Sequence, residues 1–282
     1  MTSLLFPRET LLHVVKTLPA APQILARLGK MRLDPAADLN DVTALLKCDA
    51  ALTTRIIRIA NTPAYSVGVP YASLEQALAR VGFGEIYRIA GFAAVAQMSN
   101  QSLREYGITG ARLRENSLLS ALLMEAIGVF AGVDPNEAYS VGLLRSIGKV
   151  AVEGFIRDSI DRESFDPTAG KMLAEWEKGL TGFTNCEAGA FVLNEWHFPP
   201  EICSAIAFHY NPEVDAPDSR VAHVLNLAAG AADELGFGLP GEEPYWTRTA
   251  QKWTAAGIDE KQLAEASASA MQQFTRLRAA VG

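Results

Sequence analysis

The stretch Gly142-Leu143-Leu144-Arg145-Ser146-Ile147-Gly148-Lys149 decides the fold prediction. Its apolar residues have helical spacing, and Gly148 is a typical helix exit. The helix that carries it has a clear start at Asp134-Pro135-Asn136-Glu137, which combines an N-cap carboxylate, a proline at the first helical position and a glutamate at the third. We therefore predict one helix that runs to about Ile147.

The segments around this stretch also have helical spacing. Leu118 to Phe130 is the most apolar helix and is closed by Gly132, whereas residues 158–181, which include Glu175-Trp176-Glu177-Lys178, are expected to be more exposed. Further helices are predicted over Cys186 to Glu195, Pro200 to Phe208, Arg220 to Leu235 and Glu260 to Val281.

The N-terminal part gives the same helical signals. Asp49 is the expected N-cap of a helix over Ala50 to Ala60, and Ser73 is the expected cap of one over Leu74 to Val81. Strand-like alternation is hard to find, so the predicted fold class is all-α, a two-part helical bundle. Tyr106 to Gly110 is interpreted as a linker. We place the boundary near residue 108, between an N-terminal subdomain of residues 1–108 and a C-terminal one of residues 109–282.

Composition restricts the partners and the location. The chain has 25 Lys and Arg residues against 32 Asp and Glu residues, a formal charge of -7, which offers no overall positive field to nucleic acid or to an anionic membrane. Three widely spaced cysteines support neither a disulfide framework nor a zinc knuckle. No signal peptide is recognised, and the longest apolar run, Ile89 to Ala96, is too short to cross a bilayer. We expect a cytoplasmic protein with neither a membrane nor a nucleic-acid partner.

Two sets of motifs resemble one family over nearly the whole chain: the HDOD domain, a divergent relative of the HD metal-dependent phosphohydrolases of bacterial signalling. The motifs in the N-terminal half are Leu18-Pro19, the run from Asp49 to Thr62, Ser73-Leu74 and Val81-Gly82; those in the C-terminal half are Gly142-Leu143-Leu144, Ile147-Gly148-Lys149, Phe183-Thr184-Asn185 and Ala205-Ile206 with His209.

The resemblance implies where metal ligands would lie in an active HD relative. Those positions match Asn116, the pair Arg145-Ser146, Asn185 and a site on or near Ala229. A metal ligand must be a neutral imidazole or an anionic carboxylate, and a guanidinium does not deprotonate at any working pH. We therefore expect neither a metal nor another cofactor at this site, and no catalysis.

Two alternatives remain for Arg145. With Lys149 four residues further on, it could hold an anion such as a phosphate or a nucleotide, with Ser146, Asn116 and Asn185 as hydrogen-bonding neighbours. The favoured alternative is an internal ion pair, for instance with Glu115 or Glu187, because buried charges are usually paired within the protein.

The histidines offer little support for a relocated metal site. His209 occupies a position that matches the family, and His197 and His223 lie elsewhere in the same half. A lone histidine on an apolar helix more often satisfies a local hydrogen bond than binds a metal.

The expected function is that of a non-catalytic signal-transduction protein of HDOD type. It would bind other signalling proteins and could bind a small anionic ligand in a relict pocket of Asn116, Arg145, Ser146, Lys149, Asn185 and His209. The alternative is a metal-dependent phosphohydrolase that acts on a nucleotide or cyclic nucleotide through an unconventional ligand set.

Overall fold

The computed structural model describes residues 8–281 except Ala20, Ala64, Val67, residues 99–101, Asp158 and residues 160–161. The described residues form helices and no named strand, with one isolated antiparallel bridge between Leu103 and Ile108. The all-α prediction is confirmed. Within these residues, none of the helices combines the length and the apolarity that crossing a bilayer requires.

The N-terminal helices begin where the sequence places their caps. The Asp49 carboxylate accepts the Leu52 backbone N–H, and the Ser73 hydroxyl accepts that of Gln76, so both predicted N-caps are confirmed. The helices are α1 (Arg8–Thr17), α2 (Ala21–Leu33), α3 (Leu39–Lys47), α4 (Ala50–Ala60), α5 (Leu74–Val81) and α6 (Phe83–Met98).

The C-terminal helices follow after residue 108. Asp134 caps α8 through the backbone N–H groups of Asn136 and Glu137, as predicted. The elements are α7 (Gly110–Ala131), α8 (Pro135–Leu144), α9 (Ile147–Arg157), α10 (Leu173–Thr181), α11 (Asn185–Glu195), α12 (Pro200–Phe208), α13 (Pro212–Asp215), α14 (Arg220–Ala232), the short helices η1 (Asp233–Phe237) and η2 (Glu243–Trp246), α15 (Ala250–Ala256) and α16 (Glu260–Val281).

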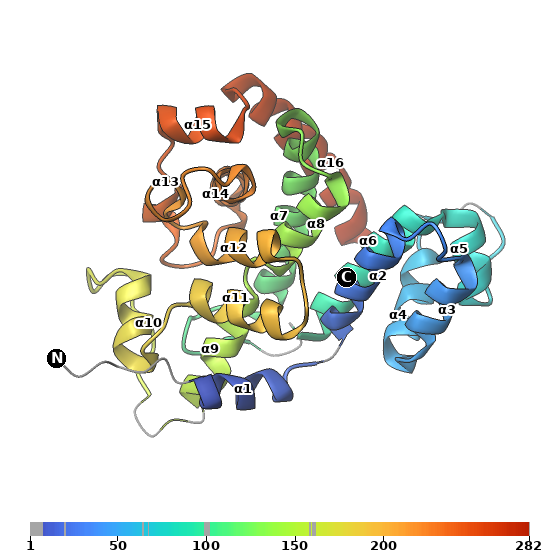
Figure 1. Cartoon of the computed structure of the whole chain (residues 1–282), viewed down its shortest axis with the longest axis horizontal. Helices are drawn as coiled ribbons and strands as arrows, with labels where there is room; N and C mark the ends of the chain where they lie inside the picture. The colour runs from blue at the N-terminus through green and yellow to red at the C-terminus, as the bar shows by residue number, and fades with distance from the viewer. Residues whose placement is uncertain are drawn as a thin grey trace.

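Helices α7 and α8 pack together at the centre of the molecule, with α16 along α7 (Figure 1). Helices α3, α4 and α5 gather on one side of this pair, and α10 to α14 lie on the other. Helix α1 lies away from α2 and packs against α9 and α11, while α2 packs against α6 and also contacts α8. Elements on either side of residue 108 are therefore in contact, and the division into 1–108 and 109–282 remains a proposal.

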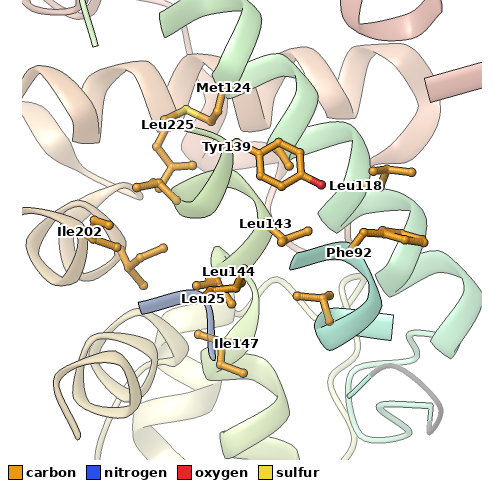
Figure 2. Close-up of a cluster of buried hydrophobic side chains, with 14 of the residues drawn as sticks. Leu25, Phe92, Leu118, Met124, Tyr139, Leu143, Leu144, Ile147, Ile202 and Leu225 are labelled. Atoms are coloured by element: carbon orange, nitrogen blue, oxygen red, sulfur yellow. The ribbon is translucent and has the colours of Figure 1, made fainter. Parts of the chain in front are cut away.

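Leucine and aromatic side chains from both sides of residue 108 share one core. Figure 2 shows Leu25 of α2 and Phe92 of α6 among side chains of α7, α8 and α12. A Cβ added at Gly91 of α6 would lie 2.9 Å from a methyl carbon of Leu143 and 3.2 Å from one of Leu25, so these side chains close tightly over a glycine.

Most of the described residues between 159 and 181 are exposed, as expected. Trp176 within this segment is nevertheless only 1% exposed, and Tyr106, in the turn between α6 and α7, is also 1% exposed. Their rings meet edge to face with centroids 5.1 Å apart. The long loop before α10 has no periodicity to reveal this contact, because the two residues are 70 positions apart.

Candidate functional site

Two glycines bring α7, α8, α9 and α11 together around the central stretch. A Cβ added to Gly142 would lie 2.4 Å from the Ser120 carbonyl oxygen, and one added to Gly148 would lie 1.7 Å from that of Asn185. Both distances are far below van der Waals contact, so a side chain would push these backbones apart. The close packing places Arg145 and Lys149 between α7 and α11.

The helix that carries the stretch ends earlier than predicted. Helix α8 ends at Leu144 and α9 begins at Ile147, so a single helix to about Ile147 is wrong. The apolar pattern does not reveal the break, because Leu143, Leu144 and Ile147 are buried on both sides of it. The turn at 145–146 lets α8 pack on α7 while α9 packs on α11.

Arg145 is buried in an ion pair. Its Nη1 lies 3.0 and 2.9 Å from the two carboxylate oxygens of Glu242, and its Nη2 donates to Asn116 Oδ1 at 2.7 Å. The guanidinium carbon also lies 5.6 Å from the ring centroid of Trp246. Arg145 is 2% exposed and Glu242 is 1% exposed, so both charges have lost their water and depend on each other.

Lys149 approaches the same carboxylate from α9. Its Nζ lies 3.1 Å from Glu242 Oε1 and donates to the Tyr210 hydroxyl at 2.9 Å. It also lies 5.1 Å from the ring centroid of Tyr106, a distance at which the ring face attracts a cation. Lys149 has no exposed surface.

Glu242 is the anion at the centre of this cluster. It accepts hydrogen bonds from Arg145 and from the Tyr210 hydroxyl, the latter at 2.8 Å. Burial alone would raise the pKa of its carboxyl, but Arg145, Lys149 and the Tyr210 hydrogen bond outweigh burial and lower the pKa to about 2. Glu242 is therefore ionised throughout the neutral range.

A second buried carboxylate, Glu177 of α10, completes the cluster. It accepts the Tyr106 hydroxyl at 2.7 Å, the Asn185 backbone N–H at 2.8 Å and the Asn185 side-chain amide at 2.9 and 3.1 Å. Burial raises the pKa of Glu177, while Lys149 and these hydrogen bonds oppose the shift. Asn185 also donates to Tyr210 at 3.2 Å, which links Glu177 to Glu242.

The predicted pocket residues therefore divide into two groups. Arg145, Lys149, Asn116 and Asn185 join one network, and the Asn116 amide also donates to the Phe237 carbonyl at 2.8 Å. Ser146 instead faces a small, mostly apolar space lined by residues of α6, α7, α8 and α9, and its hydroxyl has no hydrogen-bond partner among the described residues.

His209 lies beside the network rather than in it. Its Nδ1 donates to the Ile206 carbonyl at 2.9 Å, as expected of a histidine that satisfies a local bond, and its ring packs against Tyr210 with centroids 4.7 Å apart. Burial lowers the pKa of His209 to about 3, with the positive charge of Arg145 adding to the effect. The imidazole is neutral at physiological pH.

The residues at the metal-ligand positions do not fit a metal ion. Arg145 is cationic and already bound to Glu242, and Ala229 has no donor atom. His223 of α14 bonds to the Ser219 carbonyl at 2.9 Å, and His197 is exposed. In the part of the chain that the structure describes, no group of three or more His, Cys, Asp or Glu side chains is arranged to hold a metal.

Arg145 does form an internal ion pair, but not with the two glutamates considered from the sequence. Glu115 pairs with Arg278 at 2.7 Å, and Glu187 pairs with Lys178 at 3.5 Å and caps α11. The observed partner, Glu242, lies in the loop between η1 and η2, where Gly241 has a φ of 78°. Sequence reasoning missed Glu242, Glu177, Tyr210 and Tyr106, because a loop residue and distant helices carry no shared pattern.

The HDOD domain family model matches residues 18–212 of the chain. The match covers Arg145, Lys149 and Asn185, whereas Glu242 lies beyond its end.

Solved structures of similar fold cover almost the whole chain. A protein from Shewanella amazonensis, provisionally described as a phosphohydrolase, is 26% identical with a TM-score of 0.69 over 97% of this chain and 98% of its own. An HDOD domain protein of unknown function from Geobacter sulfurreducens is 20% identical, with a TM-score of 0.67 over 96% and 98%.

A curated relative is longer than this chain. It is an uncharacterised protein of Treponema pallidum, 22% identical over 240 residues, and the match covers 82% of this chain and 44% of the relative. The chain thus spans less than half the length of the curated relative it matches.

Proposed function

The chain belongs to the HDOD domain family, and from this premise we propose that it is a non-catalytic bacterial signal-transduction protein that acts by binding other signalling proteins. One observation carries the proposal. Where an active HD enzyme needs a cation bound by neutral or anionic side chains, Arg145 and Lys149 supply the positive charge themselves and Glu242 neutralises it. The site has become part of the core.

The proposal is tested first by metal content and hydrolysis. Protein purified without chelator should contain iron, manganese and zinc at far below one ion per chain. It should not hydrolyse a phosphodiester when Mn²⁺ or Mg²⁺ is supplied. An ion bound at one per chain, together with metal-dependent hydrolysis that is lost with that ion, would establish the alternative, a metal-dependent phosphohydrolase.

The interaction part requires a partner test. Tagged protein should recover the same signalling protein from an extract of its own organism in repeated experiments, and that protein, tagged in turn, should recover this chain. Two purified proteins that fail to associate in solution would contradict a direct interaction.

A second candidate function is the binding of a small anion in the relict pocket. It is favoured by the convergence of Arg145, Lys149 and Tyr210 on one carboxylate, a donor set that also suits a phosphate group. The anion would have to displace Glu242. Trp246, beside Arg145, should then report binding of inorganic phosphate or a nucleotide as a saturable fluorescence change that Trp246→Phe removes. A response that follows ionic strength alone would contradict this candidate.

A further inference from the structure

A cavity of about 290 Å³ lies between α2, α6, α8 and α12, apart from the Arg145 cluster. Its apolar wall includes Leu25, Phe198 and Ile202, each at most 6% exposed, and Figure 2 shows Leu25 and Ile202 within the core. Gly29 of α2 faces the cavity, because a Cβ added there would lie 3.7 Å from the Tyr87 hydroxyl. The volume is near the lower end of the range for small-molecule sites.

The buried hydroxyl groups of this cavity leave an acceptor available. Ser140 donates its hydrogen to the Asn136 carbonyl at 2.9 Å, so the Tyr87 hydroxyl must be the donor in the bond that joins Tyr87 to Ser140. The Tyr87 oxygen therefore keeps its capacity to accept. A ligand that donates hydrogen bonds suits this wall better than one that only accepts them.

Two carboxylates at the cavity form no direct ion pair among the described residues. Neither Glu137, which is half-buried, nor Glu201, which is exposed, forms a side-chain hydrogen bond or ion pair within the described residues. Arg32 and Lys30 also line the cavity, but Arg32 pairs with Asp134 at 2.9 Å and Lys30 is exposed. Burial raises the pKa of Glu137 and the negative charges of Asp134 and Glu201 add to that shift, while the positive charge of Arg32 opposes it.

We propose that this cavity binds an aliphatic primary amine, with its ammonium group between Glu137 and Glu201 and its hydrocarbon chain against Leu25, Phe198 and Ile202. A cation there would gain two carboxylates that lack partners, and the chain would remove apolar wall from water. The site joins α2 to α8 and α12, so an occupant would contact both sides of residue 108. The inference does not depend on the Arg145 cluster.

The test compares three probes of equal chain length on the full chain: n-hexylammonium, 1-hexanol and hexanoate. Titrations followed by calorimetry and by NMR should show saturable binding of the amine that is at least about tenfold tighter than that of the alcohol, since one charge-assisted hydrogen bond is worth about that factor. Hexanoate should bind most weakly. Absence of saturable amine binding, or equal affinity for the alcohol, overturns the proposal.

Variants locate the binding. The double variant Glu137→Gln and Glu201→Gln should lose at least about tenfold in amine affinity while its affinity for the alcohol stays the same. Glu265→Gln, a change at an exposed glutamate of α16, should leave amine binding unchanged. Gly29→Leu should fill the cavity and weaken the binding of all three probes. If this variant does not fold, the glutamine variants still show whether the amine binds at these carboxylates. Unchanged amine affinity in the double variant would place the amine elsewhere.

Discussion

At the scale of single residues, Glu242 is the only carboxylate in contact with both Arg145 and Lys149 among the described residues. We predict that Glu242→Gln lowers the free energy of unfolding by about 3–5 kcal/mol, because removing one partner leaves buried charges without compensation. The adjacent Glu243 is exposed, so Glu243→Gln should change the free energy of unfolding by less than about 0.5 kcal/mol. Urea unfolding measures both.

A double variant tests whether Arg145 and Lys149 are balanced by the same carboxylate. Adding Lys149→Met to Glu242→Gln removes one of the two cations that Glu242 balances, so the double variant should be more stable than the sum of the single effects predicts, by about 1–3 kcal/mol. Additive effects would show that the cations do not share the Glu242 carboxylate.

His209 should make the protein less stable in acid. Its pKa of about 3 in the folded protein lies below the ordinary value of 6.5, so the unfolded chain binds a proton first as pH falls. The contribution of the neutral His209 to the free energy of unfolding is fully present above pH 6.5. It is lost as the pH falls toward 3, with a slope of about 1.4 kcal/mol per pH unit.

Replacing His209 isolates this slope. Between pH 6 and pH 5, the free energy of unfolding of His209→Gln should fall less steeply than that of the wild type, by about 1.4 kcal/mol per pH unit. Parallel curves for wild type and His209→Gln would refute a buried neutral imidazole.

At the scale of elements, the helix contacts around the cluster depend on Gly148. Gly148→Ala should destabilise the protein by about 3 kcal/mol or more, because its Cβ would lie 1.7 Å from the backbone of Asn185 and α9 would have to move from α11. Gly84→Ala in α6 is the matched control. No atom lies within 4 Å of the added Cβ, so this change should be neutral or stabilising by up to about 1 kcal/mol. Thermal unfolding distinguishes the two.

The elements also show which signals a sequence carries. Asp49, Ser73 and Asp134 could be predicted as caps because an N-cap side chain accepts a hydrogen bond from the backbone N–H two or three positions further along the chain, so the signal is local. The break between α8 and α9 could not be predicted, because it allows α8 to pack on α7 and α9 to pack on α11, and no local sequence pattern indicates these contacts.

The same reasoning explains what was missed in the site. Arg145 and Lys149 could be found because the motif spacing fixes their positions, and a buried guanidinium implies an acidic partner. Choosing Glu242 instead of Glu115 or Glu187 requires the path of the loop from Gly238 to Glu242, and that path follows from tertiary packing.

At the scale of the whole molecule, the two sides of residue 108 are joined by buried and partly buried polar contacts as well as by the core. Glu153 of α9 accepts the backbone N–H groups of Arg104 and Glu105 at 2.8 and 3.1 Å, and Tyr87 of α6 bonds to Ser140 of α8. Such contacts couple the free energies of the two parts. We predict that the chain unfolds in a single cooperative transition, although the sequence predicts a boundary near residue 108.

The four tryptophans, Trp176, Trp196, Trp246 and Trp253, all lie after residue 108, so tryptophan fluorescence reports on that part alone, while far-ultraviolet circular dichroism reports on helices throughout. The two urea curves should coincide for the wild type. Tyr87→Phe, which removes the hydroxyl bound to Ser140, should lower the free energy of unfolding obtained from both curves by about 1 kcal/mol, because each part depends on the other. Curves with separate midpoints, or a shift seen by circular dichroism alone, would mean that the parts unfold independently.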